Sequence, residues 1–221
     1  MRMRNKPWAK GELEACPYYL ADPFPIREHL HSLFPKSQPV HLELGCGKGV
    51  FLASLAVEHP QINYLGIDIK SLVLASAIRN INAAYAKAHR PVDNVLLTPY
   101  DISRITNILS PADTVERIYI NFCNPWDHPK QFKKRLTHPR QLAQYATFFP
   151  KGEIWFKTDD TMLFEHSLRY FEEAGYTLKA VERDLYHSPW LAQNHPTEHE
   201  LRFVEQGLPI YFCIATKGQQ G

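Results

Sequence analysis

One strand that runs into a glycine-rich turn decides the fold class, and it reads Val40-His41-Leu42-Glu43-Leu44-Gly45-Cys46-Gly47-Lys48-Gly49. Residues 40–44 are mostly apolar, as in a buried strand, and residues 50–58 after the turn are typical of a helix. Three glycines let the backbone turn sharply and approach a ligand, and the helix start offers unpaired N–H groups. The stretch therefore predicts a strand, a ligand-binding loop and a helix, in that order.

Strands and helices alternate outward from this unit. Short apolar runs at 63–69, 94–100, 117–123 and 153–158 are typical of buried parallel strands. Helical periodicity lies between them at 74–88 and at 163–171, where Gly175 is the expected C-cap. Two longer strands, 176–186 and 209–216, flank a short helix at 198–206 and should be antiparallel, because no long crossover joins them. We expect an α/β, doubly wound, Rossmann-like sheet of seven strands, mostly parallel, with an antiparallel C-terminal strand pair.

Length and composition favour one globular domain. The chain has 221 residues, of which 44% are apolar and 22% are charged. Residues 40–221 should form this domain, after a basic, proline-rich arm at 1–39. No apolar run is long enough for a membrane span and no secretion signal is evident, so we expect a cytoplasmic protein with no membrane partner. Four dispersed cysteines and eleven histidines show no metal-site spacing, so no metal is expected. The sequence leaves open whether the chain is a monomer or a homodimer.

Positive charge is concentrated in two short segments. Residues 1–10 and 128–140 contain no acid and carry the basic residues Arg2, Arg4, Lys6, Lys10, Lys130, Lys133, Lys134, Arg135 and Arg140. The formal net charge of the chain is +2, so the remaining residues together carry −7. Such clustering is typical of a surface that grips a polyanion, although a solvated surface stretch has the same composition.

Acidic residues end three successive predicted strands around the glycine loop. Asp68 is placed to accept hydrogen bonds from ribose hydroxyls. Glu43 is placed to face the cationic methionyl part of S-adenosylmethionine, and Asp101 to meet its adenine amine. The loop matches neither the dinucleotide nor the phosphate-loop fingerprint. We therefore predict that Glu43, Gly45, Gly47, Asp68 and Asp101 bind S-adenosylmethionine, the alternative being that the acids are only helix caps.

The fourth predicted strand ends in Asn121-Phe122-Cys123-Asn124-Pro125-Trp126. The Asn124 amide can hydrogen-bond a planar base, and Trp126 can stack beside that base or pack in the core. The basic segment 128–140 follows immediately. Phosphate-binding charge thus lies next to a candidate base pocket at the carboxyl edge of the sheet, which predicts a nucleic-acid substrate.

Seven motifs in order resemble the bacterial tRNA (guanine-N7)-methyltransferase family, which belongs to the class I S-adenosylmethionine-dependent enzymes. They are residues 2–9, residues 43–49, Gly66-Ile67-Asp68, residues 121–126, Lys133-Lys134-Arg135-Leu136-Thr137, Phe156-Lys157-Thr158-Asp159 and Thr197-Glu198-His199-Glu200. The resemblance implies methyl transfer to N7 of a guanine in tRNA. It also implies that Glu43, Asp68 and Asp101 contact the donor. By the same resemblance, Asn124 occupies the position of a family aspartate that contacts the donor and takes part in catalysis. Asp159 and residues Thr197, Glu198, His199 and Glu200 would hold the guanine.

Two positions depart from the family pattern. Asn124 lacks the charge of the family's aspartate. His128 replaces a substrate-contacting lysine on an ungapped count, and Lys130 takes that role if the loop shifts by two residues. Lys133, Lys134 and Arg135 complete the expected tRNA contacts. Because guanine N7 carries a lone pair and no proton, alignment should matter more than a general base, so Asn124 should weaken turnover rather than abolish it.

Two other functions fit parts of the sequence. Asn124-Pro125-Trp126 is related to the Asn-Pro-Pro-Tyr motif of enzymes that methylate exocyclic amines, although Trp126 stands where a second proline is expected. A non-catalytic RNA-binding protein that keeps the methyltransferase fold would account for Asn124 and His128. The identity of the methylated atom separates these functions.

Overall fold

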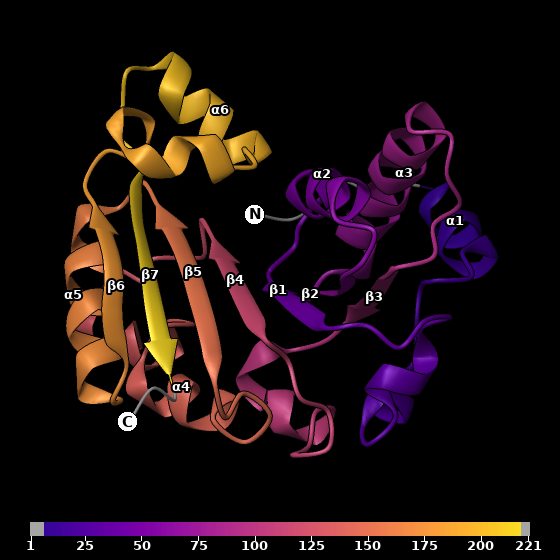
Figure 1. Cartoon of the computed structure of the whole chain (residues 1–221), viewed down its shortest axis with the longest axis horizontal. Helices are drawn as coiled ribbons and strands as arrows, with labels where there is room; N and C mark the ends of the chain where they lie inside the picture. The colour runs from indigo at the N-terminus through magenta and orange to yellow at the C-terminus, as the bar shows by residue number, and fades with distance from the viewer. Residues whose placement is uncertain (1–6, 218–221) are drawn as a thin grey trace.

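The structure is a computed structural model that describes residues 7–217, and it contains one seven-stranded sheet flanked by helices (Figure 1). The strands are β1 (Val40–Leu44), β2 (Asn63–Asp68), β3 (Val95–Pro99), β4 (Arg117–Asn121), β5 (Gly152–Thr158), β6 (Thr177–Glu182) and β7 (Tyr211–Lys217). The α-helices are α1 (Ala9–Ala15), α2 (Val50–Glu58), α3 (Ser71–Lys87), α4 (Pro139–Tyr145), α5 (Thr161–Glu173) and α6 (Glu198–Glu205). Short 3₁₀ helices are η1 (Phe24–Ile26), η2 (Leu30–Leu33), η3 (Ile102–Asn107), η4 (Pro129–Lys134), η5 (Leu185–His187) and η6 (Pro189–Gln193).

The strand order is β3-β2-β1-β4-β5-β7-β6, and strands β1 to β5 are mutually parallel. The chain builds one half of the sheet outward from β1 to β3 and the other half outward from β4. Right-handed crossovers therefore place α2 and α3 on one face and α4 and α5 on the other. This confirms the predicted doubly wound, Rossmann-like sheet, whose order reverses between β1 and β4.

The last two strands form the expected antiparallel pair, but β7 lies between β5 and β6 and is antiparallel to both. Its central residues, Phe212 to Ala215, are all buried, as an interior strand requires. The edge strand β6 is largely accessible. It ends at Glu182, earlier than predicted, because residues 185–187 turn into η5.

The sheet interior explains why the strand runs are apolar on both faces. Leu42 and Leu44 of β1 and Leu65 and Ile67 of β2 have no exposed surface. Full burial of each such side chain stabilises the fold by about 1.5–3 kcal/mol. The rigid centre of the sheet thus fixes the ends of β1 and β2, where the predicted site residues begin.

Much of the described segment before β1 packs against the sheet. The Leu97 N–H of β3 donates to the Tyr18 carbonyl (2.9 Å), and the Leu20 N–H donates to the Leu97 carbonyl (2.8 Å). Farther along, the buried Asp113 carboxylate accepts from the N–H groups of Glu28 (2.7 Å) and Leu30 (3.0 Å). The predicted basic residues Arg2, Arg4 and Lys6 lie outside the described residues, and the domain boundary at residue 39 stays a prediction.

All four cysteines are free thiols: Cys16, Cys46 and Cys213 are buried and Cys123 is half-buried. Burial raises the pKa of each of these thiols. Within residues 7–217, no helix has the length and apolar character that crossing a bilayer needs.

Candidate active site

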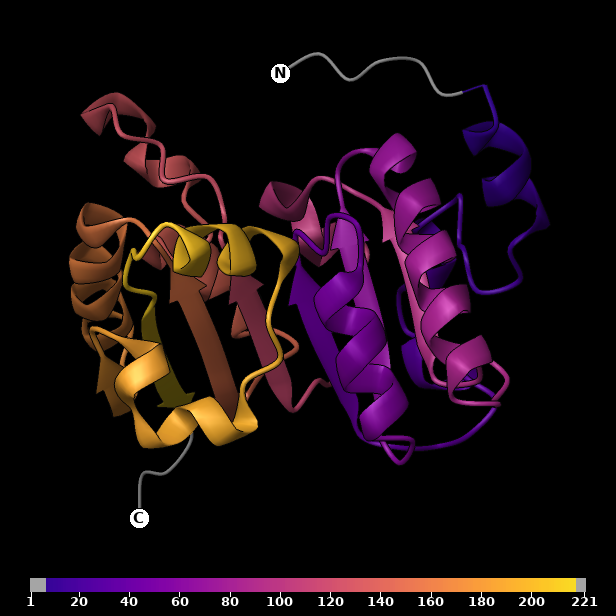
Figure 2. The same cartoon turned by 90° about the horizontal axis from the view of Figure 1, so that it is seen from above.

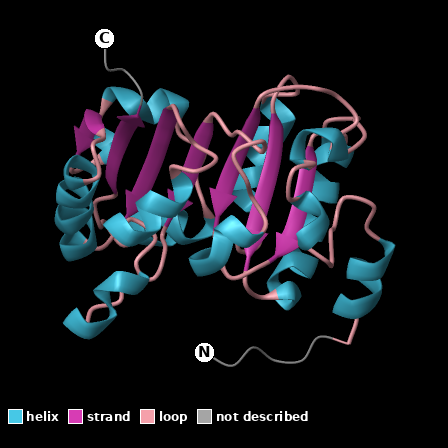
Figure 3. Ribbon diagram, turned by 90° about the horizontal axis from the view of Figure 1, so that it is seen from below, coloured by secondary structure: helices cyan, strands magenta, loops and turns pink. Residues whose placement is uncertain are grey.

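A cleft of about 1060 Å³ opens at the carboxyl edge of the parallel strands. Residues at the ends of β1 to β4 line it, together with the basic segment after β4 and the start of α6. In Figure 2 this edge is at the top, with α6 across it and the segment around η4 projecting above it. Figure 3 shows the same edge from the opposite side. Ligands of open α/β sheets bind where the strand order reverses, and this cleft lies there.

The glycine loop forms one wall of the cleft. Gly45, Gly47 and Gly49 have φ values of 81°, 53° and 67°, a region that side chains rarely adopt. A Cβ on Gly49 would lie 2.8 Å from the Cβ of Ala77, so glycine also allows α2 to pack closely on α3. No side chain caps the start of α2. Within the loop, the Gly45 and Cys46 N–H groups donate to the Ile67 carbonyl and the Gly47 N–H donates to Asp68, so the N–H groups left for a ligand are the uncapped ones at the start of α2.

Glu43 belongs to β1 and lies beside β4, at the point where the strand order reverses. Its side chain is 2% exposed, and Oε1 accepts a hydrogen bond from Asn121 Nδ2 (3.1 Å). Oε2 has no hydrogen-bond partner among the described residues. Burial raises the pKa of Glu43 to about 7; the charge of Asp68 adds to this, while the Asn121 hydrogen bond and the charge of Lys157 oppose it. A buried acceptor oxygen thus faces a ligand cleft without a donor of its own.

The other two predicted acids also line the cleft. Asp68 Oδ2 accepts from the Gly47 N–H (3.1 Å) and its Oδ1 from the Lys70 N–H (2.9 Å), so this carboxylate joins the end of β2 to the glycine loop. Asp101 caps η3 through the Ser103 N–H (2.9 Å). Each carboxylate oxygen has further lone pairs, so these backbone contacts leave acceptor capacity for a ligand.

Asn124 is exposed in a tight turn that lines the cleft. Its Oδ1 accepts from the Trp126 N–H (3.0 Å). Phe122 and Trp126, on either side, have φ values of 49° and 48°, a conformation that costs non-glycine residues about 1–3 kcal/mol each. Such local strain is typical of functional sites. The turn that carries Asn124 is therefore held in place by its surroundings.

Arg135 supplies much of that support. We expected it on the tRNA-binding surface, but it has no exposed area. Its Nε donates to the Pro125 carbonyl (2.6 Å), a second guanidinium nitrogen donates to His166 Nδ1 (2.7 Å), and the group lies 3.8 Å from the centre of the Phe132 ring. The structure thus places Arg135 beneath the turn rather than at the surface.

The remaining basic residues of the segment are exposed. Lys133, Lys134 and Arg140 line the cleft, and the Lys134 ammonium lies 4.7 Å from the centre of the Trp126 ring. Among residues 7–217, these three form no ion pair. His128 and Lys130 lie outside the cleft lining, where His128 Nδ1 accepts from the Lys130 N–H (3.3 Å) at the start of η4.

The start of α6 closes the cleft from the opposite side. Thr197, Glu198 and His199 line it, and the Glu198 carboxylate pairs with Lys48 of the glycine loop (2.8 Å). The hydrogen bond from Lys48 lowers the pKa of Glu198. Glu200, which we expected at the guanine, instead points into the protein, because its side chain completes a capping box with Thr197 and is fully buried.

A buried ion pair secures this end of α6. Lys157 Nζ of β5 lies 2.6 Å from Glu200 Oε2, and it also donates to Asn194 Oδ1 (2.8 Å) and the His195 carbonyl (2.9 Å). Burial lowers the pKa of Lys157, which the charge of Glu200 opposes. Asp159, two residues after Lys157, is largely accessible and lies outside the cleft lining. The neighbouring protein groups still remove part of the water around its carboxyl, and this desolvation raises its pKa.

Three site residues were missed in the sequence: Lys48, Asn121 and Lys157. Asn121 had a detectable signal, since it ends the strand next to the one that Glu43 ends. Lys48 and Lys157 had none, because their partners lie far away in the sequence.

Comparison with known proteins gives a consistent result. The family model described as "Putative methyltransferase" (Methyltransf_4) matches residues 37–213. The tRNA (guanine-N(7)-)-methyltransferase of Clostridium beijerinckii is 52% identical over 98% of this chain and 99% of its own length. The chain belongs to the tRNA (guanine-N7)-methyltransferase family. Another family member, from Clostridium perfringens strain SM101, is 50% identical over 98% of this chain and its full length.

A solved structure supports the fold of this family member. "Structure of an Antibiotic Related Methyltransferase" superposes with a TM-score of 0.57 at 16% identity, and covers 81% of this chain and 87% of that one. The likeness concerns the α/β methyltransferase fold.

Proposed function

We propose that this chain transfers the methyl group of S-adenosylmethionine to N7 of a guanine in tRNA. Family membership supports this function, and one structural observation carries it. A single cleft at the reversal point of the sheet combines a glycine loop, three strand-end acids and the exposed basic side chains of Lys133, Lys134 and Arg140. A cytoplasmic location, with tRNA as the partner, belongs to the same proposal.

The described residues fit the methyl donor. Glu43 offers an unpartnered buried oxygen, which a cationic group would satisfy. We propose that Asp68 holds the ribose hydroxyls and Asp101 the adenine amine, while Gly45 and Gly47 let the backbone come close and the uncapped N–H groups at the start of α2 approach the methionyl carboxylate. The cleft, at about 1060 Å³, has room for this ligand and a guanine base.

Positioning is the main task of the protein in this reaction. The donor supplies a sulfonium methyl group, and guanine N7 attacks it with a lone pair, so no proton has to be removed. The turn at Asn124 would hold the base, and the Asn124 amide offers an acceptor but no charge to the purine that becomes cationic. Glu43 and Asp68 both line the cleft, and in their ionised forms they would favour positive charge there.

The substrate side combines exposed cations with the start of α6. We propose that Lys133 and Lys134 contact tRNA phosphates, with His128 and Lys130 farther out along the same projecting segment. Thr197, Glu198, His199 and Asp159 would border the guanine. Arg135 and Glu200 take positioning roles, because their side chains are buried and hold the Asn124 turn and the start of α6.

Methylation of defined tRNA transcripts tests the function. The purified chain is incubated with labelled S-adenosylmethionine and unmodified tRNA, and the nucleosides are identified after digestion. We expect 7-methylguanosine, and we expect no product from a transcript in which 7-deazaguanosine removes the N7 lone pair. Label on an exocyclic amine would establish the alternative enzyme, and tRNA binding without any transfer would establish a non-catalytic RNA-binding protein.

A further inference from the structure

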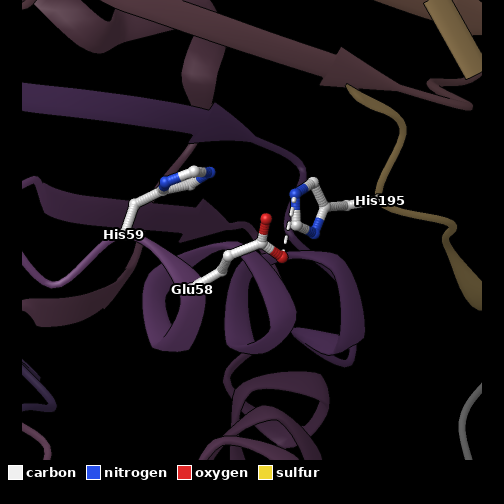
Figure 4. Close-up of side chains that lie close together, drawn as sticks. All are labelled: Glu58, His59 and His195. Carbon is white, nitrogen blue, oxygen red and sulfur yellow. Dashed lines mark ion pairs between the residues drawn. The ribbon is translucent and has the colours of Figure 1, made fainter. Parts of the chain in front are cut away.

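A second polar cluster lies outside the active-site cleft, where α2 ends. Glu58 and His59 come from the end of α2, and His195 comes from the segment that leads into α6. One ligand atom of each residue lies within 4.8 Å of those of the other two, and Figure 4 shows the three side chains pointing toward one another. All three line a separate cavity of about 250 Å³, and none of them lines the active-site cleft.

The His195 ring is oriented by contacts on both nitrogens. Its Nδ1 lies 3.0 Å from Ser54 Oγ of α2, and its Nε2 lies 3.8 Å from Glu58 Oε2. If Nδ1 donates to the serine, Nε2 carries the lone pair and faces the carboxylate. Histidine ligands of metals are held in this way, with the second ring nitrogen donating to a neighbouring acceptor. In that tautomer the Ser54 contact holds the ring with Nε2 directed toward Glu58, the direction that metal ligation by both residues needs.

The donor set identifies the class of ion. Two imidazoles and one carboxylate are ligands of Zn²⁺ sites that keep a fourth position for water. At Zn–N and Zn–O distances of about 2.0–2.2 Å, tetrahedral ligand atoms lie about 3.4 Å apart. The present separations of up to 4.8 Å would have to shrink by about 1.4 Å at most. The Glu58 side chain is 63% exposed and free to make such a movement.

We propose that Glu58, His59 and His195 bind a Zn²⁺ ion that clamps the segment before α6 onto the end of α2. The position of this segment matters for the active site. The His195 carbonyl accepts from Lys157 Nζ (2.9 Å), and Thr197, two residues later, caps α6 and lines the cleft. An ion at this site would therefore fix the residues that border the substrate, from outside the cleft.

Zinc binding to the full, untagged and metal-free chain tests the proposal. Titration calorimetry with Zn²⁺ should show one site per chain. His59→Gln and His195→Gln should each weaken binding by about 100-fold or more, because loss of an outer partner alone costs about 10–100-fold. Ser54→Ala, which removes such an outer partner, should weaken zinc binding by about 10–100-fold. The control is His187→Gln, whose imidazole is exposed and pairs with Asp184 (2.7 Å) away from the cluster.

Two further measurements keep the outcome clear. Glu58→Gln changes an exposed residue, so it tests ligation even if a histidine variant fails to fold. Co²⁺ in place of Zn²⁺ should give a spectrum without thiolate-to-metal charge transfer, because none of the predicted ligands is a cysteine. The proposal is overturned if Zn²⁺ does not bind, if Glu58→Gln binds it as well as the parent chain, if His187→Gln weakens binding as much as His195→Gln, or if the cobalt spectrum shows thiolate ligands.

Discussion

Glu43 is a buried carboxyl that lines the cleft proposed for the methyl donor. Its pKa of about 7 is raised by burial, and Asp68, Asn121 and Lys157 are the groups that modulate it. With a pKa of about 7, the carboxyl is mostly neutral at pH 6 and mostly charged at pH 8. We predict that donor affinity increases by about tenfold between pH 6 and 8, because the ionised fraction of Glu43 rises by that factor and the cationic donor binds the ionised form. Calorimetry across this range measures the effect.

The matched control for Glu43 is Glu43→Gln, which keeps the size of the side chain and an acceptor oxygen for Asn121 but cannot ionise. Titration of the donor itself affects both proteins equally, so the difference between their profiles reports on Glu43. Parallel profiles for the two proteins would contradict a role of the Glu43 charge in donor binding.

Asp68 is expected to bind the ribose as well as to hold the glycine loop through the Gly47 N–H. We predict that Asp68→Ala weakens S-adenosylmethionine binding by about 1.5–3 kcal/mol, the usual value of hydrogen bonds to a charged group. Calorimetry at constant pH checks this prediction. Unchanged affinity would mean that Asp68 only caps the loop.

Asn124 allows a test by restoration of charge. An aspartate keeps an oxygen for the Trp126 N–H and adds a negative charge beside the base that becomes cationic. We predict that Asn124→Asp is at least as active as the parent, and that Asn124→Ala loses about 100-fold in turnover. Single-turnover methylation of one transcript compares the three proteins. If Asn124→Ala matches the parent, this residue serves only the turn.

At the scale of elements, contiguous features were predictable from the sequence and distant pairings were not. The loop after β1 and the acids that end β1 and β2 follow from strand periodicity, because parallel strands bring their carboxyl ends together. The insertion of β7 between β5 and β6 has no local signal. Arg135 looks like its lysine neighbours in the sequence, and only the fold shows that it is buried. For the same reason, His195 gave no sign of pairing with His59.

One buried carboxylate ties the segment before β1 to the rest of the structure. Asp113 accepts from the N–H groups of Glu28, Leu30 and Ser110 and from the Ser110 hydroxyl. We predict that Asp113→Ala lowers the free energy of unfolding by about 3 kcal/mol, because buried donors lose their acceptor. Urea denaturation measures the loss.

The control for Asp113 is Glu12→Ala, which removes the exposed ion pair between Glu12 and Arg79 (2.7 Å) in the same part of the chain. A surface pair of this kind contributes at most about 1 kcal/mol. Equal losses in the two variants would show that the Asp113 contacts do not anchor the segment.

At the scale of the whole molecule, the uneven charge should govern tRNA binding. Lys133, Lys134 and Arg140 belong to the basic segment that includes the projecting η4, they line the cleft, and none of them is neutralised by an ion pair among residues 7–217. Cations of this kind displace counterions from phosphates, so the affinity should fall steeply with salt concentration. Arg135 is not part of this group, because it is buried.

We predict that changing Lys133, Lys134 and Arg140 together to glutamine weakens tRNA binding and leaves donor affinity unchanged. Each lost phosphate contact reduces the slope of log affinity against log salt by about 0.7–0.9. The slope of the triple variant should therefore be smaller by about 2–3. Filter binding over a salt series measures the slope. The control is the triple variant of Lys36, Lys87 and Lys151, which has the same change in net charge but alters residues outside the cleft lining. If both variants lower the slope equally, tRNA responds to the total charge of the protein, and the cleft is not its specific binding surface.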